Sequence, residues 1–144
     1  MVCGCLGVKT PPVSVSTPPA LLVEYHRTGG IAALDDRLII FDNGVGIITG
    51  KTVNTEISLN QTDLDRITGI FNDAQFSMLE PSYSARRGET DFIRYTISYH
   101  SKTVNTEESA VPPRLQPVID KLDQIMSRGM EQEPAVRPFM NLNL

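Results

Sequence analysis

Tryptophan is absent from this sequence, and its only two cysteines, Cys3 and Cys5, lie within the first five residues. A framework of disulfides through the body of the chain is therefore excluded, and a fold of this length must be held together by the burial of apolar side chains. The sequence also lacks an apolar run of roughly 18 residues, which is the length that a membrane-spanning helix needs. These absences favour a globular domain with its own hydrophobic core.

Basic residues are fewer than acidic ones, so the net charge is −4 and the isoelectric point is about 5.1. They are also dispersed along the chain, apart from the pair Arg86-Arg87. A protein that binds nucleic acid needs a basic face to contact the phosphates. The sequence therefore predicts that nucleic acid is not the partner.

Residue types that build catalytic and metal sites are scarce. The only two histidines, His26 and His100, have no second metal ligand at close spacing. The sequence contains no H-E-x-x-H, C-x-x-C or calcium-loop pattern and no G-x-S-x-G nucleophile turn. We therefore predict no catalytic residues, no metal and no cofactor. Residues distant in the sequence can still meet in a fold, so a small enzyme is kept as the least favoured hypothesis.

Residues 1–20 contain both cysteines and four of the ten prolines, and they lack helical or strand periodicity. Their prolines, serines and threonines predict an extended linker. Three interpretations of the cysteines stay open: a disulfide or metal site, two buried structural thiols, or a lipobox. Two thiols supply only half of a tetrahedral metal site, and a linker has no core in which they could be buried.

The segment Val2-Cys3-Gly4-Cys5 resembles the end of a lipoprotein signal, in which a small residue precedes the cysteine that receives the lipid. Cys5 is then the lipidation candidate, and the linker is the tether of a surface lipoprotein. Such a signal needs a basic start and an apolar stretch, whereas four residues precede Cys5. A processed chain predicts an extracytoplasmic, cell-surface protein that meets the membrane only through its lipid. A native, unprocessed N-terminus predicts a cytoplasmic protein.

Residues 21–129 carry the patterns of a folded domain, whereas residues 130–144 carry none and predict a flexible tail. Asp42-Asn43-Gly44 predicts a hairpin turn of type I′, because Asn-Gly accommodates positive φ. Strands are predicted where β-branched and aromatic residues gather or alternate with polar ones, over 21–27, 34–41, 45–53, 92–99 and 102–107.

Apolar residues at spacings of three and four predict two amphipathic helices. The first begins at Ser58, whose spacing to Gln61 is that of a capping box, and its Gly69 predicts close packing. The second follows Pro112-Pro113 and ends at Gly129, a natural C-cap.

The order of these elements is ββα-ββα. It predicts an α+β fold with an antiparallel sheet of about four to five strands and both helices on one face. The other face of the sheet is predicted to be wet, in agreement with the polar residues Arg94, Thr96, Ser98 and His100.

The hexapeptide Lys-Thr-Val-Asn-Thr-Glu occurs twice, at 51–56 and 102–107. Each copy is predicted to follow a strand and to precede a helix. A decayed duplication and the convergence of two similar hairpin edges both explain the repeat, and neither predicts a function.

One segment resembles a known family. Tyr25-His26-Arg27-Thr28-Gly29-Gly30-Ile31-Ala32-Ala33-Leu34 is similar to the opening of emfourin-like proteins, which have a strand, an arginine, a variable residue, paired glycines and a turn of small residues. The order of later segments is similar too, over roughly residues 23–127: Ala74-Gln75-Phe76, then Asp91-Phe92 before Tyr95-Thr96-Ile97, then Val111-Pro112-Pro113-Arg114-Leu115 before the last helix. Ala33 departs from the family, which often has glycine at this position.

Emfourin is a small α+β protein that inhibits thermolysin-like zinc metalloproteases. The resemblance therefore implies a non-catalytic domain whose partner is another protein, and a thermolysin-like metalloprotease in particular. The alternative is an envelope lipoprotein domain with a structural role or a different ligand.

Binding residues concentrate on loops that a rigid scaffold displays. We therefore expect the partner to contact two turns, which contain Arg27, Thr28, Gly29, Gly30 and Ile31 in one case and Asp42, Asn43 and Gly44 in the other. A second interpretation stays open for the first turn. The paired glycines would serve the turn alone, and the arginine would pair with a carboxylate such as Asp91.

Overall fold

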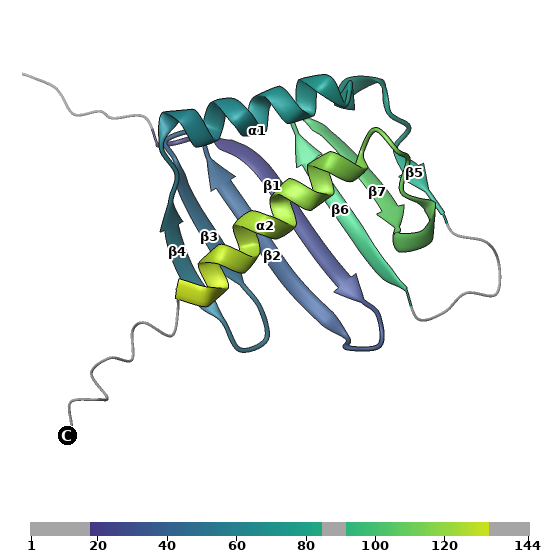
Figure 1. Cartoon of the computed structure of the whole chain (residues 1–144), viewed down its shortest axis with the longest axis horizontal. Coiled ribbons are helices and arrows are strands. Elements are labelled where there is room, and N and C mark those ends of the chain that lie inside the picture. The colour runs from purple at the N-terminus through teal and green to yellow at the C-terminus, as the bar shows by residue number, and fades with distance from the viewer. Residues whose placement is uncertain (1–17, 85–91, 133–144) are drawn as a thin grey trace, which may run out of the picture.

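The computed structural model describes residues 18–84 and 92–132, and Cys5 and Asp91 lie outside them. The described chain forms one mixed sheet with two helices packed on one face (Figure 1). Its elements, in chain order, are β1 (Leu21–Gly29), β2 (Leu34–Phe41), β3 (Val45–Thr49), β4 (Asn54–Ser58), α1 (Gln61–Asp73), the 3-10 helix η2 (Phe76–Met78), β5 (Ser82–Tyr83), β6 (Ile93–Tyr99), β7 (Lys102–Glu107), the 3-10 helix η3 (Glu108–Ala110) and α2 (Gln116–Gln132).

The sheet has seven strands in the order β4-β3-β2-β1-β6-β7-β5. Every neighbouring pair is antiparallel except β5 and β7, which are parallel. The predicted α+β class is confirmed. The predicted sheet of four to five antiparallel strands in ββα-ββα order is wrong in detail, because β4 and β5 were missed. β4 is an edge strand with exposed Asn54, Glu56 and Ser58, and polar edge strands carry little hydrophobic signal.

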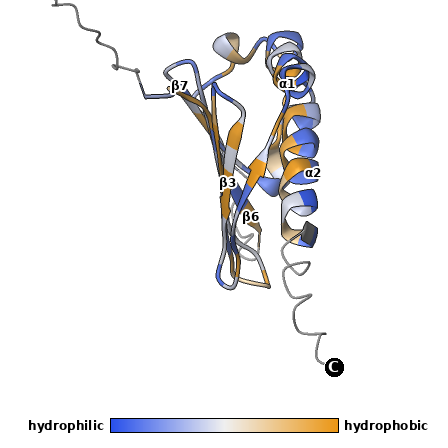
Figure 2. Cartoon of the chain, turned by 90° about the vertical axis from the view of Figure 1, so that its left-hand side faces the viewer, coloured by the Kyte–Doolittle hydropathy of each residue, from blue (hydrophilic) through white to orange (hydrophobic). Residues whose placement is uncertain are grey.

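The core lies between the sheet and the helices, which form a single layer beside it (Figure 2). Alternate residues of each central strand point into this layer, because successive side chains of a strand lie on opposite faces. On β1 these residues are Val23 and Tyr25, and on β6 they are Ile97 and Tyr99. The helices contribute the stripes that their spacing predicts: Leu64, Ile67 and Phe71 from α1, and Val118, Ile119, Leu122, Ile125 and Met126 from α2.

The face of the sheet that the helices leave uncovered carries both polar and apolar side chains. On β6 it carries Arg94, Thr96 and Ser98, as predicted. On β2 and β3 it carries Ile39 and Ile47, which are cross-strand partners and only partly buried. The prediction of a wet face therefore holds for β6 and in part for β2, whose exposed Asp35 and Arg37 share this face with Ile39. It is wrong at Ile47 of β3.

The two tight hairpins differ in the φ angles of their turns. Gly44 has a φ of 93° whereas Asn43 keeps a negative φ, and Gly44 N–H donates to Phe41 O at 3.0 Å. This is a loop of residues 42–44 and not the predicted type I′ turn, which needs two positive φ angles. The turn between β6 and β7 does have them, with φ values of 49° at His100 and 64° at Ser101. His100 thus lies in a turn and not on the strand.

The two copies of the hexapeptide adopt different structures. Residues 102–107 form the whole of β7. Residues 51–56 begin in the β3–β4 turn, and only Asn54–Glu56 of this copy lie in β4. Each copy follows a strand and precedes a helix, as predicted. The copies differ because β7 has hydrogen-bonded neighbours on both sides, whereas β4 is an edge strand.

Three predictions about the helices are wrong: the N-cap of α1, the close packing at Gly69 and the C-cap at Gly129. Asn60 and not Ser58 caps α1, through reciprocal bonds with Asp63 of 2.8 and 3.1 Å. Gly69 has no atom within 4 Å of the position that a Cβ would take, so it does not mark close packing. Gly129 lies inside α2 and does not end it. A Cβ on Gly129 would come within 2.1 Å of Ile48 Cδ1, so glycine lets the helix approach the sheet.

Candidate functional site

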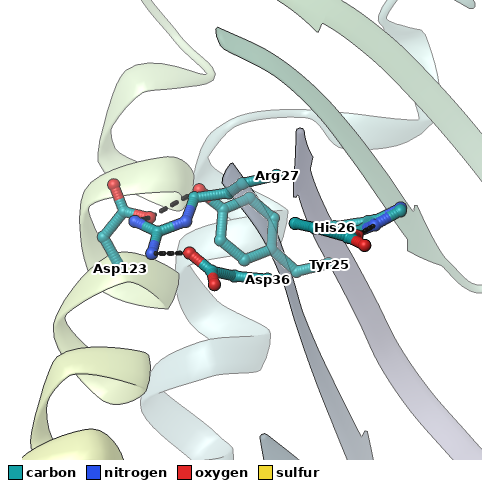
Figure 3. A network of polar contacts seen from close by, with 6 residues as sticks. Tyr25, His26, Arg27, Asp36 and Asp123 are labelled. Atoms are coloured by element: carbon teal, nitrogen blue, oxygen red, sulfur yellow. Dashed lines mark hydrogen bonds and ion pairs between the residues drawn. The ribbon is translucent and has the colours of Figure 1, made fainter. Parts of the chain in front are cut away.

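Arg27 lies at the centre of a polar network between the sheet and α2 (Figure 3). It is on the inner face of β1, directly opposite Asp36 of β2. Its Nη2 donates to Asp36 Oδ2 at 2.7 Å, and its Nη1 donates to Asp123 Oδ1 of α2 at 3.1 Å. The guanidinium therefore joins two strands and a helix, and its side chain is only 19% exposed.

Tyr25 completes this network from the same strand. Its hydroxyl donates to Asp123 Oδ1 at 2.6 Å, so the carboxylate accepts from both Tyr25 and Arg27. Burial raises the pKa of Tyr25 far above its ordinary value, and the hydrogen bond to Asp123 raises it further. A tyrosine in this state donates a hydrogen bond and does not act as a base at neutral pH.

The network pairs one guanidinium with two carboxylates. Burial by itself would lower the pKa of Arg27, but the hydrogen bond to Asp36 and the charge of Asp123 together raise it. One buried donor, Arg27 Nε, has no partner within the described residues. The network holds α2 against the end of β1, and because the guanidinium is engaged on two sides, Arg27 supports the adjoining loop from below.

The loop that follows β1 is fixed by its backbone. Gly29 and Gly30 have φ values of 91° and 79°, which residues with side chains rarely adopt. The Gly30 N–H donates to Phe92 O at 3.0 Å, and the Ala33 N–H donates back to Gly30 O at 3.0 Å. A Cβ on Gly29 would come within 2.9 Å of Phe92 O, so glycine is needed there for space as well as for φ.

Ile31 lies at the tip of this loop and is 89% exposed, more than any other large apolar residue in the described chain. It stands between Gly30, which is bonded to Phe92, and Ala33, which is bonded to Gly30. Residues 29–33, called the Gly-Gly loop below, therefore combine a restrained backbone with an exposed apolar side chain.

The second predicted loop, Asp42-Asn43-Gly44, lies at the opposite end of the sheet (Figure 1). β1 separates the two loops, and its nine residues span roughly 30 Å. Polar groups of this turn are used locally: Asp42 Oδ1 accepts from Ala20 N at 3.1 Å, and Asn43 Oδ1 accepts from Val45 N at 3.1 Å. The structure therefore does not bring the two sets of predicted contact residues together.

The two histidines also lie apart. His26 is on the uncovered face of β1, where Nε2 lies 2.9 Å from Asp35 Oδ1, and this hydrogen bond lowers the pKa of Asp35. His100 lies in the β6–β7 turn, beyond the far end of β1. Within residues 18–84 and 92–132, no group of three or more His, Cys, Asp or Glu side chains is placed to hold a metal ion.

The network that supports the Gly-Gly loop was not predicted, and the partner proposed for Arg27, Asp91, lies outside the described residues. One signal in the sequence was available. Asp123 interrupts the apolar stripe of α2, four residues after the buried Ile119 and next to the buried Leu122. A carboxylate at such a position needs a partner in the core, because burial of an unpaired charge is costly.

No helix in the described ranges is long and apolar enough to cross a membrane. No model of a protein family matches the sequence, and a comparison with curated proteins gives no match. The likeness to emfourin-like proteins therefore stays a prediction that rests on the residues quoted for it.

Proposed function

We propose that this protein is a non-catalytic, protein-binding domain that resembles a metalloprotease inhibitor and contacts its partner through the Gly-Gly loop. The observation that carries the proposal is the exposure of Ile31, at 89%, on a loop whose backbone is held on both sides. An exposed, large apolar side chain gains free energy when a partner buries it, at about 25 cal/mol per Å² of apolar surface.

The support beneath the loop favours tight binding. Binding costs conformational entropy whenever a flexible loop becomes ordered, and a loop that is already fixed avoids most of this cost. Here Gly30 is bonded to Phe92, and the strand that leads into the loop is bonded to α2 through Arg27. The Gly-Gly loop is therefore preorganised for its partner.

The backbone of the loop also agrees with the proposed family. Ala33 is the position at which emfourin-like proteins often have glycine, and its φ here is 52°, in the left-handed region that glycine adopts without strain. Ala33 adopts this conformation at a modest cost in strain, and the positive φ supports the proposed likeness.

Inhibition of a thermolysin-like metalloprotease by the full chain tests the proposal. We expect saturable inhibition by the wild type and a loss of about tenfold or more in affinity for Ile31→Asp, because the variant places a charge where an apolar side chain is buried. The matched control is Ile47→Asp, which makes the same change on the uncovered face of β3. Equal inhibition by the wild type and Ile31→Asp, or no inhibition by either, overturns the proposal.

A second candidate function is an envelope lipoprotein domain that binds through the sheet. It is favoured by the partly exposed pair Ile39 and Ile47 on the uncovered face. In this case Ile47→Asp abolishes association with the envelope and Ile31→Asp does not. Both candidates include a tether at the N-terminus, and mass spectrometry of the native protein checks it by the mass of a lipid on Cys5.

A further inference from the structure

A hollow of about 350 Å³ opens at the other end of the sheet from the Gly-Gly loop. It lies between the C-terminal end of α1, the η2 turn and the β6–β7 turn. Its volume is at the small end of the range for sites that bind small molecules. It is therefore a second candidate site, and it shares no residue with the loop that we propose for the protein partner.

Stacked rings form the buried wall of the hollow. The Phe71 and Tyr99 rings stack with centroids 4.0 Å apart, and His100 stacks on Tyr99 at 4.1 Å. Phe76 meets Phe71 edge-on at 5.1 Å. Phe71, Phe76 and Tyr99 are buried, whereas the His100 ring is exposed at the outer end of the stack. A flat group that enters the hollow would extend this stack by lying against the His100 ring.

Two strained backbone positions frame the same hollow. Gln75 and His100 have φ values of 52° and 49°, which are uncommon for residues other than glycine and asparagine. Left-handed residues of this kind persist where the surrounding structure holds them, and they gather at functional sites. Here they direct the chain around the rim of the hollow from two different elements.

The polar groups of the rim include a lysine ammonium, two side-chain amides and an imidazole. Lys102 Nζ donates to the Ser77 and Leu79 carbonyls, and an ammonium has a third proton to donate. Within the described residues, the side chains of Asn72 and Gln75 and the ring nitrogens of His100 make no hydrogen bond. No carboxylate lines the hollow in this part of the chain.

The charge of the rim thus favours an anion. The negative end of α1 is close by, and two of its last carbonyls are engaged, since Ala74 N–H donates to Ile70 O and Gln75 N–H donates to Asn72 O. Lys102 is held in place by its two carbonyl partners, so its free proton is positioned before a ligand arrives.

From this arrangement we infer that the hollow binds a small carboxylate that carries a flat, apolar group. The flat group lies against the exposed ring of His100, at the outer end of the stack. The carboxylate accepts a hydrogen bond from Lys102 and from the amides of the rim. This inference does not depend on the proposed protease partner, because the two sites lie at opposite ends of the sheet (Figure 1).

A titration of the full chain, followed by two-dimensional amide NMR, tests the inference with hydrocinnamate and hydrocinnamide as probes. We expect saturable shifts in the amides of residues 75–78 and 99–102, with a dissociation constant of about 1 mM for the carboxylate. The amide probe should bind about fivefold more weakly or worse, because it lacks the charge that Lys102 recognises. Equal binding of the two probes, or no saturable shift at these residues, overturns the inference.

Two variants distinguish the contribution of the Lys102 ammonium to binding from that of the His100 ring. Lys102→Met keeps the aliphatic stem, and we expect it to abolish the preference for the carboxylate, whereas Lys51→Met at the other end leaves the preference unchanged. His100→Gly relieves the strained φ and removes the outer ring, and we expect it to weaken both probes in a folded protein. Retention of the carboxylate preference in Lys102→Met, or of full affinity in His100→Gly, contradicts the site.

Discussion

The two ends of the sheet use their polar groups in opposite ways. At the end of β1 that leads into the Gly-Gly loop, Arg27, Asp36, Asp123 and Tyr25 bond to one another beside α2, and the apolar Ile31 projects outward. At the other end the rings are buried, and the amides and His100 on the rim keep free hydrogen-bonding groups. Charged side chains that pair with one another inside the protein hold the projecting Ile31 in place. Polar side chains without partners around the hollow can instead bind a ligand.

The largest effect is expected when this support is broken. Arg27→Met should lower the free energy of unfolding by about 3 kcal/mol, because it leaves Asp36 and Asp123 without their cation in a largely buried place. Arg37→Met is the matched control, since Arg37 pairs with Glu24 at 3.3 Å on the exposed face, and it should cost under about 1 kcal/mol. Urea unfolding of both variants measures the difference, and equal losses would show that the network does not support this end.

The next effect contrasts the two helices. Gly129→Ala should destabilise by about 2 kcal/mol, because its Cβ would meet Ile48 Cδ1 at 2.1 Å where α2 crosses the sheet. Gly69→Ala in α1 has open space and should stabilise by about 0.5–1 kcal/mol through helix propensity. Thermal unfolding checks both signs. A stable Gly129→Ala would mean that α2 does not lie this close to β3.

Tyr25→Phe should cost about 1 kcal/mol at neutral pH, the value of one hydrogen bond to a partly buried carboxylate. The pKa of Tyr25 is raised in the folded protein above its unfolded value of about 10. Its protonated hydroxyl therefore contributes fully to the free energy of unfolding below about pH 10, and this contribution is lost as the pH rises above that value. In this alkaline range, the free energy of unfolding of the wild type should therefore fall by about 1.4 kcal/mol per pH unit more than that of the variant. Parallel stability curves for the two proteins would contradict the burial of this hydroxyl.

The smallest effect on stability is expected at Ile31. Its side chain is almost fully exposed, so Ile31→Asp should change the free energy of unfolding by less than about 0.5 kcal/mol. Calorimetry checks this value, which also validates the variant for binding experiments. A large loss of stability would show that Ile31 packs against the domain and is not available to a partner.

The sequence predicted the elements whose patterns are strong and local. The alternation of β6 and the apolar stripes of both helices placed Tyr95, Ile97 and Leu122 correctly on the inner side. It missed β4, whose exposed Asn54, Glu56 and Ser58 give no apolar face, and β5, which is only two residues long. Local patterns also could not determine the sheet order, because β1 pairs with β6 across more than sixty residues of intervening sequence.

The candidate site was predictable only in part. The paired glycines indicated a turn, and the structure gives both of them positive φ. The partners of Arg27 are nine and 96 residues away, so the identity of the network depends on how α2 docks on the sheet. The docking of α2 also determines the role of Gly129. In the sequence, a glycine near the end of a helix predicts a C-cap, whereas in the structure Gly129 makes room for Ile48 of the sheet.

Hydrogen exchange of the full chain with and without a thermolysin-like metalloprotease tests the central claim most directly, because it shows which end of the sheet a partner covers. If the partner binds the Gly-Gly loop, we expect slower exchange in residues 28–34 upon binding and no change in residues 42–45 or 99–103. Protection at the β6–β7 turn while the Gly-Gly loop exchanges as fast as in the free protein would contradict it.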